Sequence, residues 1–115
     1  MTWTDKLADM RGSLKSLNTL QPDTAKGFHA LTKAAKSPAV LDVKTLEFVA
    51  LGIAVADRCE PCIAFHVESL VKLGATRAEM GEVLSMCIQM GGGPSLMYAA
   101  KALQCFDELA GSADT

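Results

Sequence analysis

Two cysteines and a histidine stand close together near the middle of the chain, in the pattern Cys59-Glu60-Pro61-Cys62 followed by His66. At the helical advance of about 100° per residue, the two thiols and the imidazole fall within an arc of about 60°. A helix N-terminus lowers the pKa of a thiol, and His66, four residues after Cys62, can take its proton. Cysteines three residues apart in a helix are also close enough for a disulfide. The segment therefore predicts a dithiol that cycles with a disulfide beside an imidazole.

Glu47 is the single charged residue of segment 45–56, which is otherwise mostly apolar. The residues that share its side of a helix are Leu51, Ala54 and Val55. A carboxylate on that face would be partly buried, and burial raises the pKa of a carboxyl group. The alternative is that Glu47 lies in the first helical turn, where acids favour the helix dipole, and points to solvent.

The two-cysteine motif has other interpretations. Zinc could bind Cys59, Cys62 and His66, with a fourth ligand from Glu47, His29 or another chain. Haem attachment needs a histidine directly after the second cysteine, where Ile63 stands, and a thioredoxin-like site needs a βαβ pattern, which is not visible. Both cysteines could also be small core residues that perform no chemistry.

The remaining sulfur and imidazole side chains are interpreted as structural. Cys87 and Cys105 lie in apolar stretches and are predicted to be inert core residues, and His29 beside Phe28 is predicted to be a satisfied structural residue. Met80, Met86, Met90 and Met97 are most simply core filling, although they could line an apolar pocket for a peroxide or lipid-like substrate.

Helix signals recur along the chain, whereas no strand pattern persists. Asn18 to Gln21 and the Ser37-Pro38 pair predict helix ends, as do Gly74 and the triple glycine 91–93, and residues 111–115 are expected to be frayed. The sequence thus predicts an all-α domain of five or six helices. Their approximate ranges are 3–17, 22–37, 43–56, 60–73, 76–90 and 95–109.

The chain has 115 residues, which fits one domain over residues 1–115. With 50% hydrophobic and 21% charged residues it is not a disordered sequence, and a net charge of −2 without a basic stripe argues against nucleic-acid binding. The longest apolar run, residues 48–56, is far shorter than the roughly 20 residues that span a bilayer. The early charges at residues 5, 6, 9 and 11 do not fit a signal peptide. We therefore expect a soluble, cytoplasmic protein without membrane contact.

The predicted helix 43–56 is apolar nearly all round, which is typical of a helix that is buried on every side. A domain of 115 residues encloses such a helix only with difficulty. Either the other helices wrap it or another subunit covers part of it, and the second alternative favours a homo-oligomer.

The pattern of Glu47, eleven intervening residues, Cys59-x-x-Cys62, three more residues and His66 resembles the active site of AhpD-like alkylhydroperoxidases. These proteins belong to the carboxymuconolactone decarboxylase superfamily. The segment Gly74-Ala75-Thr76 with Glu79 and Glu82 is also similar to that family, and the resemblance covers about residues 41–103.

The resemblance implies an all-helical bundle completed by oligomerisation, commonly as a trimer or hexamer. It implies reduction of small hydroperoxides by Cys62 as the attacking thiol and Cys59 as the resolving thiol, with His66 and Glu47 as a proton relay. A dithiol partner, such as a lipoylated or thioredoxin-like protein, would reset the pair, and no cofactor or metal is expected. Pro61 departs from the pattern, because the best-known AhpD proteins carry a histidine there. A decarboxylase-like lyase and a zinc-binding or redox-sensing module are the alternatives.

Overall fold

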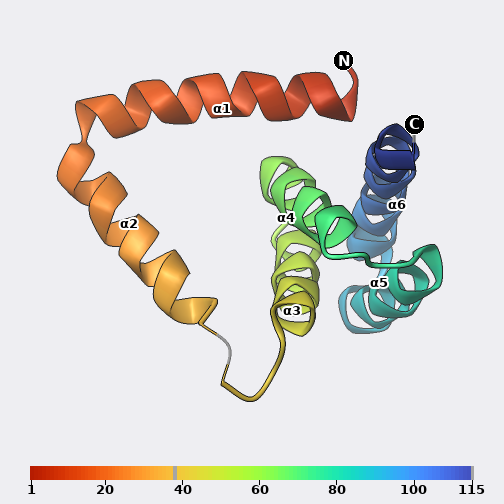
Figure 1. Cartoon of the computed structure of the whole chain (residues 1–115). Coiled ribbons are helices and arrows are strands. Elements are labelled where there is room, and N and C mark those ends of the chain that lie inside the picture. Colours follow the sequence, from red (N-terminus) through yellow and green to blue (C-terminus); the bar gives the residue numbers. More distant parts are fainter. Residues whose placement is uncertain (38, 115) are drawn as a thin grey trace.

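The computed structural model describes residues 1–37 and 39–114, and over these residues it is all-α with six helices and no strand (Figure 1). The helices are α1 (Trp3–Leu20), α2 (Pro22–Ala35), α3 (Val43–Ala56), α4 (Glu60–Lys72), α5 (Arg77–Gly91) and α6 (Gly93–Asp114). The predicted fold class is therefore confirmed. None of the described helices combines the length and apolarity that a membrane span requires.

Local signals in the sequence fix the ends of the helices that surround the two-cysteine motif. Asp42 caps α3, where its Oδ1 accepts the backbone N–H of Thr45 at 2.8 Å. Thr76 and Glu79 form a reciprocal capping box at the start of α5. Gly74 takes a φ of +80° just after α4, a conformation that glycine adopts without a steric penalty. These three predicted boundaries are confirmed.

Two helices are longer than predicted. Residues 18–20 continue α1, and Gln21 is the single residue that separates it from α2. Gly92, with a φ of +72°, makes the break between α5 and α6 by itself, so that the other two glycines are helical. Helix α6 then runs to Asp114, so the predicted helix end at residue 109 is wrong. Pro38, which belongs to the predicted helix end at Ser37-Pro38, lies outside the described residues, as does Thr115, the last residue of the segment expected to be frayed.

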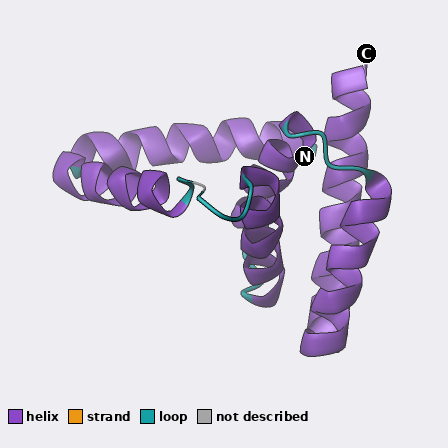
Figure 2. Ribbon diagram, turned by 60° about the horizontal axis from the view of Figure 1, so that its bottom comes forward, coloured by secondary structure: helices purple, strands orange, loops and turns teal. Residues whose placement is uncertain are grey.

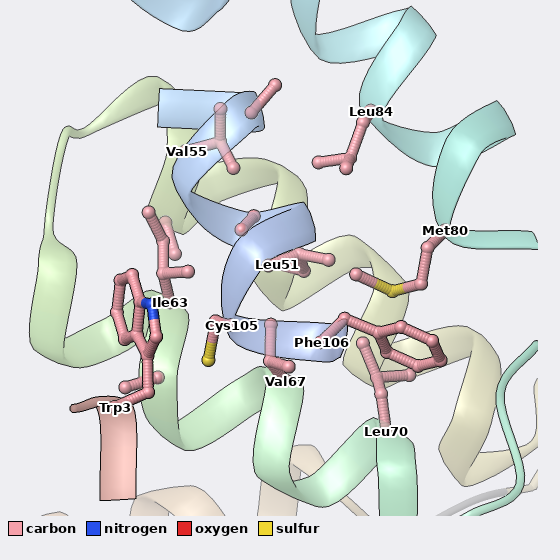
Figure 3. Close-up of a cluster of buried hydrophobic side chains, with 14 of the residues drawn as sticks. Trp3, Leu51, Val55, Ile63, Val67, Leu70, Met80, Leu84, Cys105 and Phe106 are labelled. Carbon is pink, nitrogen blue, oxygen red and sulfur yellow. The ribbon is translucent and has the colours of Figure 1, made fainter. Parts of the chain in front are cut away.

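The hydrophobic core lies between α3, α4, α5 and α6 (Figure 3). Its fully buried large side chains come from all four helices: Leu51, Val55, Ile63, Val67, Leu70, Met80 and Cys105. The start of α1 joins this core through Trp3, whose ring N–H donates to Gln104 at 3.1 Å and whose backbone N–H donates to Glu108 at 3.0 Å. One end of α1 is thereby fixed against α6.

Helices α1 and α2 together form an arm, residues 3–35, which contacts α4 and α6 through α1, whereas α2 stands away from these helices (Figures 1 and 2). Among the described helices α2 packs against α1, and it buries none of its residues. Phe28 and Leu31 remain 69% and 64% exposed. In α3, Val49 and Ile53 are also exposed, so the alternative in which the other helices of one chain wrap this helix on every side is wrong.

The tight junction of α5 and α6 leads to a stability prediction. A Cβ built on Gly91 would lie 1.8 Å from Oγ and 2.6 Å from Cβ of the buried Ser95, whereas a Cβ on Gly81 in the same helix meets nothing within 4 Å. We expect Gly91→Ala to destabilise the fold by about 1–3 kcal/mol through overpacking. The control Gly81→Ala should stabilise it by about 0.4–1 kcal/mol, because alanine reduces the entropy of the unfolded chain. Urea denaturation checks both, and equal effects of the two substitutions would contradict the close contact.

Candidate functional site

The two cysteines of the motif lie at the N-terminus of α4 and are joined in a disulfide, with their Cα atoms 5.2 Å apart. Cys59 is the N-cap residue of the helix, and its Sγ accepts the backbone N–H of Cys62 at 3.3 Å. The Cα separation is within the range that disulfides occupy. The prediction that spacing of three residues lets these thiols pair is therefore confirmed, and the pair is compatible with a redox role.

A sharp turn brings the start of α4 back beside the end of α3. The backbone N–H groups of Arg58 and Cys59 donate to the carbonyls of Val55 and Ala54, and Arg58 takes a φ of +56°. That left-handed conformation is uncommon for a residue with a side chain. Pro61 lies in the first turn of α4, where a backbone N–H has no acceptor within the helix, so that the absence of this group in proline costs no helical hydrogen bond. The turn places α4 against α3 and thereby next to Glu47.

Glu60, between the two cysteines, anchors the start of α4 to two other helices. Its carboxylate oxygens lie 2.8 Å from Nζ of Lys6 in α1 and 3.1 Å from Nζ of Lys101 in α6. Hydrogen bonds from Lys6 and then Lys101 hold the pKa of the Glu60 carboxyl below its ordinary value. The segment that carries the disulfide is thus held from both sides.

The acid and the imidazole predicted to act together are in contact. Oε2 of Glu47 lies 2.6 Å from Nδ1 of His66, and the glutamate side chain is 2% exposed whereas the histidine side chain is 27% exposed. Because Nδ1 faces a carboxylate, the ring donates its N–H there and Nε2 is the nitrogen that can exchange a proton elsewhere. The interpretation of Glu47 as a solvent-exposed residue of the first turn is therefore wrong.

Lys36 is the site residue that the sequence analysis missed. It is the C-cap residue of α2, and its Nζ lies 2.6 Å from Oε1 of Glu47. No motif includes it, because it belongs to a different helix and no periodicity relates it to Glu47. The signal that could have drawn attention to it is indirect: a buried carboxylate needs a permanent positive partner.

These contacts change the expected ionisation of the acid. Burial is the largest single influence on Glu47 and raises the pKa, as the sequence analysis expected. The hydrogen bonds from Lys36 and His66, with their charges, act in the opposite direction and together outweigh it. The pKa of Glu47 is therefore below its ordinary value, and the group is a buried carboxylate at neutral pH.

Two hollows open onto the disulfide. The smaller, of about 210 Å³, touches Cys59, Cys62 and His66 against α3 and Asp57. The larger, of about 700 Å³, lies between the arm and α4 and touches Cys62 and His66 but not Cys59. Its wall is mostly apolar, formed by Met10, Leu14, Phe28, Leu31, Ala35, Ala50, Pro61 and Phe65, and Lys36 also lines it. We call this larger hollow the cleft.

The other candidate side chains lie elsewhere. Cys105 is fully buried, and burial raises the pKa of its thiol to about 12, which confirms the prediction of an inert core residue. Cys87 is half-buried at a groove between α3 and α5, so the prediction that it is a core residue holds only in part. His29 is exposed, and its assignment to a satisfied structural position is wrong.

An all-helical fold that carries a disulfide at a helix N-terminus, backed by a buried acid–imidazole pair, defines a thiol–disulfide site. A profile of the carboxymuconolactone decarboxylase family matches residues 22–104. The chain belongs to the carboxymuconolactone decarboxylase family.

Several proteins resemble this chain over nearly its full length. An uncharacterized protein of Cupriavidus necator is 36% identical over 104 residues, which are 90% of this chain and 92% of that protein. A crystal structure of a carboxymuconolactone decarboxylase family protein from Legionella pneumophila is 44% identical, with a TM-score of 0.91 over 94% of this chain and 96% of that one. A family member from Thermotoga maritima, for which involvement in antioxidative response has been suggested, is 28% identical, with a TM-score of 0.84 over 95% and 93% of the two chains.

The ionisation of Glu47 generates a pH-dependent stability prediction. A carboxyl group whose pKa is lowered by folding contributes stability above its ordinary pKa of 4.5, and this contribution is lost as the pH falls through the lower folded value. We expect Glu47→Gln to destabilise the protein by about 1.5–3 kcal/mol at neutral pH, through loss of charged hydrogen bonds. The difference in free energy of unfolding between Glu47→Gln and wild type should become smaller as the pH falls below 4.5. Urea denaturation over a pH series measures it, and a difference that widens in acid would contradict the assignment.

Proposed function

We propose that this protein is a thiol-dependent hydroperoxide reductase of the AhpD-like type. The observation that carries the proposal is the Cys59–Cys62 disulfide at a helix N-terminus, next to the imidazole of a 2.6 Å His66–Glu47 pair. A dithiol at this position is placed to become a thiolate, because the helix N-terminus favours negative charge. The family and the suggested antioxidative role of the Thermotoga maritima relative support the same class of activity.

In the proposed cycle the reduced Cys62 gives its proton to His66 and attacks the terminal oxygen of a hydroperoxide. The O–O bond breaks, Cys62 becomes a sulfenic acid, and the departing alkoxide takes the proton from His66 to leave as an alcohol. The Cys59 thiol then attacks the sulfenic sulfur, which forms the disulfide and releases water. An external dithiol reduces the disulfide by exchange, so that each peroxide consumes two electrons from one dithiol.

The two hollows support Cys62 as the attacking sulfur. Cys62 and His66 line both the cleft and the small hollow, whereas Cys59 lines the small one. A hydroperoxide with an apolar body that enters the cleft would therefore meet Cys62 and the imidazole together. We propose small organic hydroperoxides as substrates and a lipoylated or thioredoxin-like dithiol protein as the reductant, in the reducing cytoplasm.

Peroxide consumption in the presence of a dithiol reductant tests the proposal. We expect Cys62→Ser to lower the rate at least 100-fold, because the variant lacks the thiolate nucleophile. The matched control Cys87→Ser, at a half-buried cysteine outside the site, should keep the wild-type rate. Thiol titration of the wild type should show two thiols lost together per peroxide. Unchanged consumption by Cys62→Ser would refute the proposal.

A decarboxylase-like lyase is the second candidate, and the short Glu47–His66 contact favours it, because that pair could act as an acid–base group. The two functions differ in their need for sulfur. A Cys59→Ser, Cys62→Ser double variant that still converts a lactone acid would support the lyase, and about one tightly held zinc per reduced chain would instead support a metal-binding module.

We also propose that the protein assembles as a homo-oligomer, a trimer or a hexamer. Val49, Met86 and Met90 are 54%, 60% and 78% exposed and surround an apolar groove of about 610 Å³ between α3 and α5. Contiguous apolar surface of this kind marks interaction sites. This groove and the exposed apolar residues of the arm give the single chain a large apolar surface that another copy could cover.

Light scattering after size-exclusion chromatography tests the assembly. We expect the wild type to elute with a mass three or six times that of the 12.1 kDa chain. A Val49→Asp, Met90→Asp variant should lower the mass, because it places charge on the apolar groove. The control Lys72→Asp changes an exposed residue at the end of α4, outside the groove, and should leave the mass unchanged. A wild-type mass equal to one chain would contradict the proposal.

A further inference from the structure

We propose that Lys36 is a positioning residue of the thiol site, which holds Glu47 as a carboxylate throughout the cycle and so commits His66 to exchanging its proton with Cys62. The inference rests on the proposed function and deepens it, because it assigns a role to a residue outside the two-cysteine motif. It starts from geometry: each oxygen of the buried carboxylate has its own cationic or potentially cationic partner, Lys36 on Oε1 and His66 on Oε2, both at 2.6 Å.

His66 cannot compensate the acid continuously. In the proposed cycle the imidazole gains a proton from Cys62 and loses it to the departing alkoxide, so it is neutral for part of each turnover. A carboxylate that is 2% exposed and faces a neutral ring would favour taking up a proton itself. A lysine ammonium keeps its charge through the neutral pH range, and Lys36 therefore compensates Glu47 when His66 does not.

No other charged side chain among the described residues is placed to compensate the charge of Glu47. His66 is the ionisable group that α4 presents to Glu47, and Lys36 is the one that the end of α2 presents. Lys44, on the same helix as Glu47, pairs with Glu79 of α5 at 3.0 Å instead. In the part of the chain that the structure describes, neither α5 nor α6 places a charged side chain at ion-pair distance from Glu47.

The position of Lys36 also links the arm to the site. Helix α2 packs against α1 among the described helices, so the Lys36–Glu47 pair ties the far end of the arm to α3. Lys36 lines the cleft together with Cys62 and His66. The same contact that fixes the charge of the acid therefore fixes one wall of the hollow through which substrate would reach Cys62.

Carbon-13 NMR of protein labelled at the glutamate carboxyl carbon tests the inference directly. The chain has six glutamates, and the Glu47 signal is assigned by its loss in Glu47→Gln. We expect the pH midpoint of the Glu47 signal to move upward in Lys36→Met and to return toward the wild-type midpoint in Lys36→Arg, which restores the positive charge. Lys33→Met is the matched control, because Lys33 is exposed on the same helix and has no ion pair among the described residues.

A second measurement asks whether the charge matters to turnover. We expect the ratio of peroxide consumption at pH 5.5 to that at pH 8 to be about twofold lower in Lys36→Met than in wild type, the loss that follows when about half of the Glu47 side chains are protonated at pH 5.5. Lys36→Arg should restore most of this ratio, and Lys33→Met should keep it.

The two measurements separate the possible failures. A Glu47 midpoint that Lys36→Met moves no more than Lys33→Met does would overturn the inference. A moved midpoint with an unchanged activity ratio would overturn the role of Lys36 in turnover. The NMR titration needs no peroxide, so wild-type protein that consumes none would refute the proposed function while the titration still decides whether Lys36 holds the charge of Glu47.

Discussion

The structure depends on one buried carboxylate. Glu47 lies in the most apolar helix of the chain, and such a charge is tolerated in a protein interior only when it is paired. Its partners come from the end of α2 and from α4. The two oxygen atoms of this carboxylate therefore constrain the register of α3 against α4, the position of the end of α2 and the orientation of the His66 ring.

Most of the parts of the site that the sequence predicted are set by local geometry, whereas the pairing of Glu47 with His66 was expected from the family resemblance. Cys59, Cys62 and His66 belong to one helical segment, so helical periodicity is enough to place them on one side. The caps at Asp42 and Thr76 and the glycine at residue 74 are similarly local, since each satisfies backbone groups within a few residues. Five or six helices, and an all-α fold, follow from such signals without knowledge of how the helices pack.

The parts that were missed depend on the path of the chain in three dimensions. Lys36 reaches Glu47 across a loop, and no periodicity connects them. The apolar pattern of α3 indicated burial on all sides, but burial depends on neighbours, and those within one chain leave Val49 and Ile53 exposed. The pKa of Glu47 shows the same dependence. Burial alone would raise this pKa, whereas burial together with Lys36 and His66 leaves it below the ordinary value.

The arrangement separates the acid from the sulfur chemistry. Glu47 is sealed in the interior, whereas His66 is partly exposed and Cys62 lines two hollows. In the proposed function, Nδ1 of the imidazole would face the acid and Nε2 would exchange the proton with Cys62. The N-cap of α4 joins this chemistry to the fold, because the sulfur of Cys59 accepts a backbone N–H that every helix N-terminus must satisfy. A thiolate of Cys59 would be stabilised by the same N–H. In the proposed function, the residues that begin the helix are thus also those that its N-terminus prepares for reaction.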